Sequence, residues 1–327
     1  MTARGQSFMV PSLTGGALVL STLIFNVAAS PFTLFIYNTC LLAVIGAVAL
    51  NLLMGAAGQV SIGNAAFLAT GAFGAVFAQR LGLSFPFQLI FGVVWAAAVG
   101  LLVYLPALRI RGIYLALATL SAHFIVIHFA EGYQSRAVGE SGFQLPRLFG
   151  RLTLDDEQRA WSWLLSLLLL PVLYLAHVLL NGRTGRAWRM IRDHEAAAPT
   201  LGINVGLTKL TAFVISSALV GLQGALHAQF SGSVSVNNYT LIVAIAYISM
   251  ILIGGLDTFL GPILGAIILV SLPYLTAEFV SLFTDQNLGP QIATMMYGLL
   301  IIVFIVSSPK GIIGLIGAVR QSWGKTD

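Results

Sequence analysis

Charged residues are what this sequence has least of. Only 8% of its 327 residues are Asp, Glu, Lys or Arg, whereas about a quarter of an ordinary soluble domain is charged. The 16 Lys and Arg and the 11 Asp and Glu are too few to give a chain of this length a normally hydrated surface. A soluble globular protein is therefore excluded.

Cysteine and the common catalytic motifs are also scarce. The single cysteine, Cys40, lies in an apolar run, so the sequence offers neither a disulfide framework nor a thiolate metal site. No Gly-Lys-Ser/Thr follows the glycine-rich stretches, and no HExxH motif, Ser-His-Asp set or pair of carboxylates stands at a useful depth. We expect no catalytic residue, no cofactor and no metal, which leaves a membrane-embedded enzyme with little support.

Apolar residues are abundant instead. They make up 58% of the chain, and the mean hydropathy is +0.93. At roughly 20 residues per crossing, they predict an all-α polytopic membrane protein with about ten transmembrane or re-entrant helices in one domain, 1–327. The expected segments are 8–29, 32–53, 60–79, 85–107, 112–131, 160–180, 209–230, 240–253, 258–279 and 290–308.

Three of these segments need comment. The run 60–79 is rich in Gly, Ser and Asn, and 240–253 is short for a full crossing, so either is open to a broken or re-entrant form. The run 8–29 follows Arg4 and imitates a secretory signal, but it is the first of many similar runs. We therefore predict an uncleaved first helix.

Basic residues predict the orientation. The segment 181–209 carries four arginines and a lysine against two acids, so we expect it to be cytoplasmic. Counting crossings outward from it places both termini in the cytoplasm, a cytoplasmic loop at about 181–208 and a periplasmic loop at about 132–159. Most basic residues then lie inside, and the formal net charge of +5 is too dispersed to indicate nucleic acid as a partner.

Residues 185–198 predict a short amphipathic helix within the cytoplasmic loop. Trp188 and Ile191 fall on one side, arginines fall elsewhere, and Pro199 ends the pattern. Such a helix is either an anchor lying in the membrane interface or a docking element for a cytoplasmic partner. The residues alone leave both interpretations open.

Several motifs, taken together, show a resemblance to a known family. GRAWRMIRDHEAAAPTLGINVGLTKLTAFVISSALVGLQGAL at 185–226 resembles the coupling-loop region of LivM-like permeases, which belong to ATP-binding-cassette (ABC) importers of branched-chain amino acids. Further similar stretches follow in order along most of the chain: NLLMGAAGQVSIGNAAFLATGA at 51–72, LPALRIRGIYLALATL at 105–120, ILIGGLDTFLGPILGA at 251–266 and SPKGIIGL at 308–315.

The resemblance implies a substrate-translocating subunit in the bacterial cytoplasmic (inner) membrane, surrounded by membrane lipid. It would pair with a second homologous permease, sit on two cytoplasmic ATPase subunits, and receive a small amino-acid substrate from a periplasmic substrate-binding protein. Glu195-Ala196-Ala197 before Gly202 is similar to the EAA-and-glycine loop of importer permeases, with four intervening residues instead of the usual three. The expected ATPase-coupling residues are Arg186, Arg189, Arg192, Glu195 and Gly202.

Other residues have two interpretations each. Arg109 and Arg111 are topology charges or a secondary cytoplasmic contact. Polar residues in the spans either form hydrogen bonds between helices or line the pathway, and the pathway candidates are Gln59, Ser61, Asn64, Thr119, His123, Gln223 and Ser249. Glycines either allow close helix packing or break helices near the pathway, and those singled out are Gly58, Gly63, Gly254, Gly255 and Gly261.

The predicted function is therefore an importer permease for branched-chain or related small amino acids, driven by separate ATPase subunits. The alternative is a stand-alone secondary transporter coupled to ions or protons. That alternative needs a buried carboxylate near mid-membrane, but the acids nearest to a span, Glu131 and Glu278, lie toward its outer end.

Overall fold

The computed structural model describes residues 3–107, 112–150, 152–281, 292, 295–296, 298–299, 302–303 and 311–314, with side chains from residue 13 onward except at residue 281. Its α-helices are α1 Ala3–Ala28, α2 Pro31–Leu50, α3 Asn64–Arg80, α4 Phe85–Ala107, α5 Ile113–Val138, α6 Leu154–Asn181, α7 Arg183–His194, α8 Val205–Ser231, α9 Leu241–Gly254 and α10 Gly261–Ser281. Arg109 and Arg111 lie outside the described residues, as does most of the expected segment 290–308.

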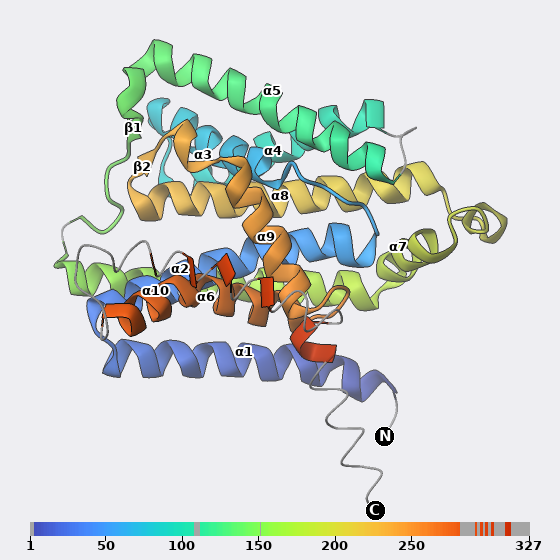
Figure 1. Cartoon of the computed structure of the whole chain (residues 1–327), viewed down its shortest axis with the longest axis horizontal. Coiled ribbons are helices and arrows are strands. Elements are labelled where there is room, and N and C mark those ends of the chain that lie inside the picture. Colours follow the sequence, from blue (N-terminus) through green and yellow to red (C-terminus); the bar gives the residue numbers. More distant parts are fainter. Residues whose placement is uncertain are drawn as a thin grey trace, which may run out of the picture.

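Successive long helices run back and forth between two ends of the molecule (Figure 1). At one end lies the short helix α7. At the other end, β1 Phe143–Gln144 pairs antiparallel with β2 Ser233–Val234, which ties the α5–α6 connection to the α8–α9 connection. The described start of α1 lies at the same end as α7.

Seven described helices are long and apolar enough to cross a membrane, which confirms a multi-pass, all-α membrane protein. They occupy Pro31–Ala56, Phe85–Pro106, Ile113–Ser141, Leu154–Asn181, Val205–Ser231, Val236–Gly254 and Gly261–Val280. The predicted run 8–29 contributes a shorter apolar helix, Leu13–Ala28. The predicted run 60–79 becomes α3, which has 17 residues.

Helix α3 is the buried centre of the fold. Most of its side chains are buried, and it packs against α4, α8 and α5. Contact with α8 requires residues without side chains, because a Cβ at Gly71 would overlap the backbone of Gly221 and one at Gly224 would overlap the carbonyl of Leu68. These glycines therefore serve close helix packing, as small residues do in membranes.

Helix α2 leads into an irregular segment. Ser30 caps its start by accepting a hydrogen bond from the Thr33 amide at 3.3 Å, and Pro31 fits the first helical position. At its other end α2 passes into a π-helical segment, η1 Asn51–Ala56, of the kind often found at functional sites. No helix forms over residues 57–63, so the predicted run 60–79 becomes helical only from Asn64.

Helices occupy more of the two predicted loops than expected. In the predicted periplasmic loop 132–159, α5 continues to Val138 and α6 begins at Leu154. The Thr153 side chain caps α6 by accepting from the Asp156 amide at 3.3 Å. The predicted loop 181–208 contains α7 and a 3-10 turn, η3 Ala198–Leu201, before α8 begins. Helices α5 and α6 therefore extend into the polar sequence beyond their apolar portions, as capped helices do.

Candidate functional site

Helix α7 is amphipathic, as predicted. Trp188 and Ile191 are buried, and Trp188 donates its indole N–H to the Thr208 carbonyl at 3.0 Å. Gly185 lets the helix approach the end of α6, because a Cβ there would overlap the Leu180 carbonyl. Arg186 and Asp193 are exposed. The helix thus has one face fixed to the bundle and one face free of it.

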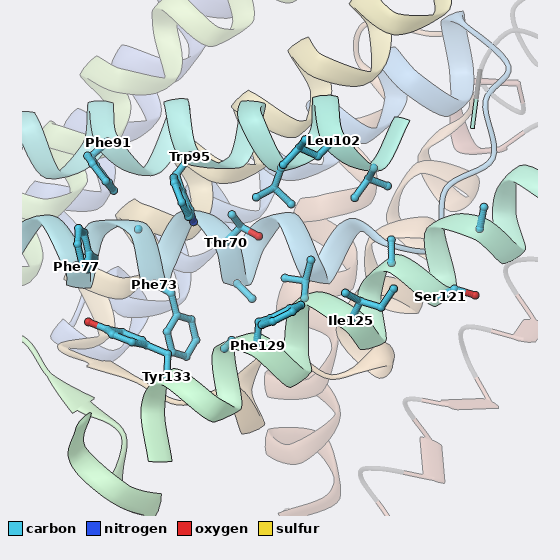
Figure 2. A pocket seen from close by; sticks show the side chains of 18 of the residues that line it. Thr70, Phe73, Phe77, Phe91, Trp95, Leu102, Ser121, Ile125, Phe129 and Tyr133 are labelled. Carbon is cyan, nitrogen blue, oxygen red and sulfur yellow. The ribbon is translucent and has the colours of Figure 1, made fainter. Parts of the chain in front are cut away.

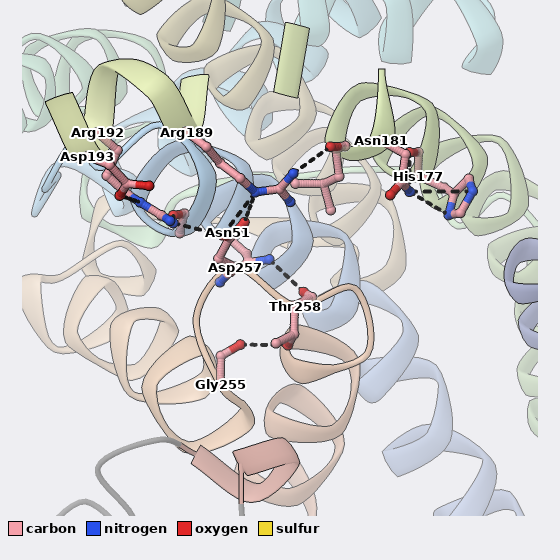
Figure 3. Close-up of polar contacts among 11 residues, drawn as sticks. Asn51, His177, Asn181, Arg189, Arg192, Asp193, Gly255, Asp257 and Thr258 are labelled. Atoms are coloured by element: carbon pink, nitrogen blue, oxygen red, sulfur yellow. Dashed lines mark hydrogen bonds and ion pairs between the residues drawn. The ribbon is translucent and has the colours of Figure 1, made fainter. Parts of the chain in front are cut away.

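Two of the predicted coupling arginines bind a carboxylate on the α9–α10 turn (Figure 3). Arg189 Nε donates to both oxygens of Asp257, at 2.9 and 3.0 Å, and its Nη1 donates to the Leu180 carbonyl at 2.9 Å. Arg192 Nη1 lies 2.8 Å from Asp257 Oδ2 and also donates to the Gly55 carbonyl. Arg192 Nε bonds Asp193 at 2.9 Å, and this hydrogen bond lowers the pKa of Asp193.

The turn that carries Asp257 is held by α2's continuation. Asn51 accepts from the Asp257 amide at 3.0 Å and donates to the Thr258 carbonyl at 2.9 Å. Asp257 has φ +57°, and it is the one non-glycine residue in the described ranges with a positive φ. Gly255, two residues earlier, has φ +115°. Asn51, Asp257 and the two arginines form one network, which we call the Asp257 clamp.

Glu195 and Gly202 occupy the chain that leads from α7 to α8. Glu195 pairs with Lys209 Nζ at 2.8 Å, and the Lys209 carbonyl accepts from Gln59 Nε2 at 3.0 Å. Gly202 has φ +75° and ends η3 in the left-handed conformation that favours glycine. Gly202 therefore lies at the point where the chain turns from η3 toward α8.

Five of the pathway candidates flank the point where Ile62 and Gly63 contact Thr119 on α5; among them, Gln59 donates instead to the Lys209 carbonyl of α8. Ser61, Asn64 and Gln59 are each 2% exposed. The Ile62 amide donates to Thr119 Oγ1 at 3.0 Å, and His123 follows one helical turn later on α5. Within the described part of the chain, no hydrogen-bond partner is present for Gln59 Oε1, Ser61 Oγ, Asn64 Nδ2 or His123 Nδ1. Buried polar atoms normally have partners, and we call these five residues the polar cluster because the described contacts leave several of their polar atoms unpaired.

The remaining candidates lie elsewhere. Gln223 on α8 donates to the Tyr247 hydroxyl on α9, beside Gly46. Ser249 donates to the Ile245 carbonyl of its own helix at 3.0 Å. Neither residue is joined to the polar cluster by a described contact. In the described ranges, no group of three or more His, Cys, Asp or Glu side chains is placed to hold a metal ion.

The predicted glycines divide between the two interpretations. Gly254 and Gly261 pack directly on each other, and Gly63 packs on the Thr119 carbonyl. Gly58, with φ +66°, and Gly255 instead adopt turn conformations next to the Asp257 clamp. Close packing and helix interruption therefore both occur in these stretches.

Comparison with known proteins identifies the family of this chain. Residues 32–305 match the family described as the permease component of branched-chain amino acid transport systems. The chain belongs to this family. The prediction of a permease subunit of an ABC importer is thereby confirmed, and the match favours it over a stand-alone secondary transporter.

Curated relatives agree with the family. The high-affinity branched-chain amino acid transport system permease protein LivM of Escherichia coli K12 is 29% identical, over 95% of this chain and 79% of the relative. LivM of Salmonella typhimurium LT2 is 28% identical, over 94% and 78%. A probable LivM of Methanocaldococcus jannaschii is 22% identical, over 69% and 68%. No solved structure matches the chain significantly.

Sequence reasoning missed two features of this permease. One is Asp257, to which the sequence patterns assigned no role. The signal for it was an acid between the predicted spans 240–253 and 258–279, which the counting of crossings places on the same side as the arginine-rich loop. Opposite charges confined to one end of a bundle are close enough to pair.

The other is an apolar groove of about 840 Å³ between α3, α4 and α5 (Figure 2). Aromatic pairs four residues apart line it: Phe73 and Phe77, Phe91 and Trp95, and Phe129 and Tyr133. This spacing places each pair on one helix face. None of the predicted pathway residues lines the groove.

Proposed function

We propose that this chain is the translocating subunit of an ABC importer for branched-chain or related small amino acids in the bacterial inner membrane. Its partners would be a second homologous permease, two cytoplasmic ATPase subunits and a periplasmic substrate-binding protein. The observation that carries the proposal is α7, a short helix fixed to the bundle on one face and exposed on the other. Such a helix can pass the closure of an ATPase dimer to the spans.

The proposed docking surface is the outward face of α7 and the turn after it. Arg186 presents an exposed guanidinium there, held near the helix start by a 3.3 Å bond to the Asn181 carbonyl. A planar guanidinium suits directed pairing with carboxylates of a partner. Arg189 and Arg192 fix the angle of α7 through the Asp257 clamp, while Glu195 and Gly202 fix the path of the chain that follows.

The proposed translocation pathway passes the polar cluster of Gln59, Ser61, Asn64, Thr119 and His123. Its unpartnered amide, hydroxyl and imidazole atoms match the donors and acceptors of an amino-acid backbone. Non-helical backbone at membrane depth is tolerated where it lines such a site. Gln223 and Ser249 remain candidates for a separate position along the route.

The test is uptake by the complete complex in vesicles. We expect leucine uptake to require ATP, the ATPase subunits and the binding protein. Glu195→Arg and Gly202→Asp should each lower substrate-stimulated ATP hydrolysis by about tenfold, a loss of roughly 1.4 kcal/mol in coupling. Asp156→Asn, at the opposite end of the molecule, is the control. Unchanged coupling in both variants contradicts the docking assignment, and uptake without the ATPase subunits supports the secondary transporter instead.

A further inference from the structure

We infer that Asp257 is a positioning residue that links movement of α7 to the polar cluster through residues 55–64. This inference rests on the proposed function, because it assumes that α7 receives the motion of the ATPase subunits. Three observations carry it: one carboxylate shared by two arginines, an arginine stem lying on the backbone of 55–58, and an irregular segment ending at unpartnered polar atoms.

The shared carboxylate is the first step. The side chains of Arg189, Arg192 and Asp257 are 33%, 29% and 22% exposed, so the clamp is only partly sheltered from water. Its contribution therefore lies in geometry, because one carboxylate receives directed bonds from two guanidinium groups. Two arginines one helical turn apart, bound to the same residue, also define the rotation of α7. The helix therefore cannot turn or shift without moving the α9–α10 turn or breaking the network.

Backbone strain at Asp257 points the same way. Its φ of +57° lies in the region where glycine is the low-strain residue. Glycines already occupy positions 254 and 255 of this turn. The acid is held in that conformation by Asn51, whose side chain bonds both the Asp257 amide and the Thr258 carbonyl (Figure 3). Aspartate enters this region more readily than most side chains, and here the conformation directs the carboxylate toward Arg189 and Arg192.

Contact with residues 55–58 is the second step. Arg192 donates to the Gly55 carbonyl, and its aliphatic stem covers Gly58 so closely that a Cβ there would overlap it. A second connection runs in parallel, from Glu195 to Lys209 and from the Lys209 carbonyl to Gln59. Displacement of α7 therefore acts directly on the backbone of this segment.

The irregular segment is the third step. Residues 57–63 form no helix, so this backbone can shift without breaking a helical hydrogen-bond ladder. It ends at the Ile62–Thr119 hydrogen bond and at the buried Ser61 and Asn64. One short stretch of chain thus connects the docking helix to the polar cluster. Asp257 holds Arg192, which in turn contacts Gly55 at the start of that stretch. Asp257 itself lies in neither the docking surface nor the polar cluster.

The experiment measures amino acid transported per ATP hydrolysed by the assembled complex in proteoliposomes. Asp257→Asn and Asp257→Gly should leave assembly and ATP hydrolysis in place but lower this ratio by about fivefold or more. The double variant Arg189→Gln/Asp257→Asn should be no worse than Asp257→Asn alone, because both changes break one network. Asp155→Asn is the matched control, because Asp155 pairs with Arg159 at 3.0 Å at the opposite end of the molecule.

A wild-type ratio in both Asp257 variants overturns the inference. If both Asp257 variants fail to fold, the Arg189→Lys variant tests the inference instead, because lysine keeps the charge but cannot hold both carboxylate oxygens. A transport-to-ATP ratio below that of the wild type supports the inference, and a wild-type ratio overturns it. Failure of the proposed function is distinguishable, because the wild-type complex would then show no ATP-dependent uptake.

Discussion

At the scale of single residues, the α7 end of the molecule depends on two positions with left-handed backbone. Gly58 and Asp257 both have φ near +60°, and both touch Arg192. At position 58, glycine adopts the left-handed backbone without steric strain. At position 257 the same backbone carries an aspartate, whose carboxylate accepts hydrogen bonds from Arg189 and Arg192. The two sites therefore respond differently to substitution.

Gly58→Ala should be strongly destabilising. A left-handed alanine costs about 1–2 kcal/mol, and displacing the Arg192 stem adds about 1–3 kcal/mol. Gly82→Ala is the matched control, because Gly82 has φ +78° but no atom stands within 4 Å of its added Cβ. We expect a larger drop in the thermal unfolding midpoint in detergent for Gly58→Ala. Equal drops would show that the Arg192 contact contributes nothing.

Sequence patterns singled out the two arginines of the clamp, but as contacts with the ATPase subunits, and they missed Asp257. The arginines of α7 stood out because they are dense, and the apolar spacing of Trp188 and Ile191 predicted their helix. Their partner could not be assigned, because Asp257 lies far along the chain and only the folded turn brings it beneath α7. The unpartnered atoms of Ser61, Asn64 and His123 were likewise beyond reach, since burial and pairing are properties of the assembled bundle.

At the scale of elements, glycines determine how closely α3 and α8 approach. The backbones of the two helices come into direct contact at Gly71, Gly221 and Gly224. In a membrane, where lipid is as apolar as the protein, van der Waals packing of this kind replaces the hydrophobic effect as the main attraction between helices.

Gly224→Ala should therefore destabilise the bundle by about 1–3 kcal/mol, because the added methyl group forces α8 away from the Leu68 carbonyl. Gly132→Ala on α5 is the control. No atom lies within 4 Å of its added Cβ, and alanine in a helix is favoured over glycine by about 0.4–1 kcal/mol. Thermal unfolding of both variants should shift in opposite directions, and a destabilised Gly132→Ala would contradict this account.

Apolar runs predicted most elements but not their irregularities. The bounds of α4 and α10 follow composition closely, whereas the π-helical segment η1 and the non-helical 57–63 carry no distinct periodicity. These irregular pieces are stabilised by tertiary contacts, such as the Asn51 bonds to the α9–α10 turn. The hydropathy pattern of one segment cannot indicate which distant segment will form hydrogen bonds with it.

At the scale of the whole molecule, the alternating helices place α7 and the β1–β2 ladder at opposite ends. If α7 faces the cytoplasm, as we propose, the β1–β2 end faces the periplasm. The single cysteine, Cys40, is 7% exposed. We therefore expect it to react little with thiol reagents, so that labelling reports mainly on cysteines introduced by mutation.

Asp156→Cys should react with a membrane-impermeant maleimide in intact spheroplasts, because the α6 start would face the periplasm. Thr200→Cys, in the exposed turn after α7, should react only after the membrane is permeabilised. Cys40→Ala supplies a background without the native thiol. Labelling of Thr200→Cys in intact spheroplasts would reverse the orientation.

The central position of α3 has a consequence for biogenesis. This helix is 17 residues long, rich in Ala and Gly, and mostly buried by its neighbours in the bundle. A segment of this kind partitions poorly into lipid by itself. Its packing partner α8 is synthesised only after α4 to α7 have left the ribosome. We therefore expect α3 to leave the insertion machinery late, or to be sheltered by α4, until α8 packs against it.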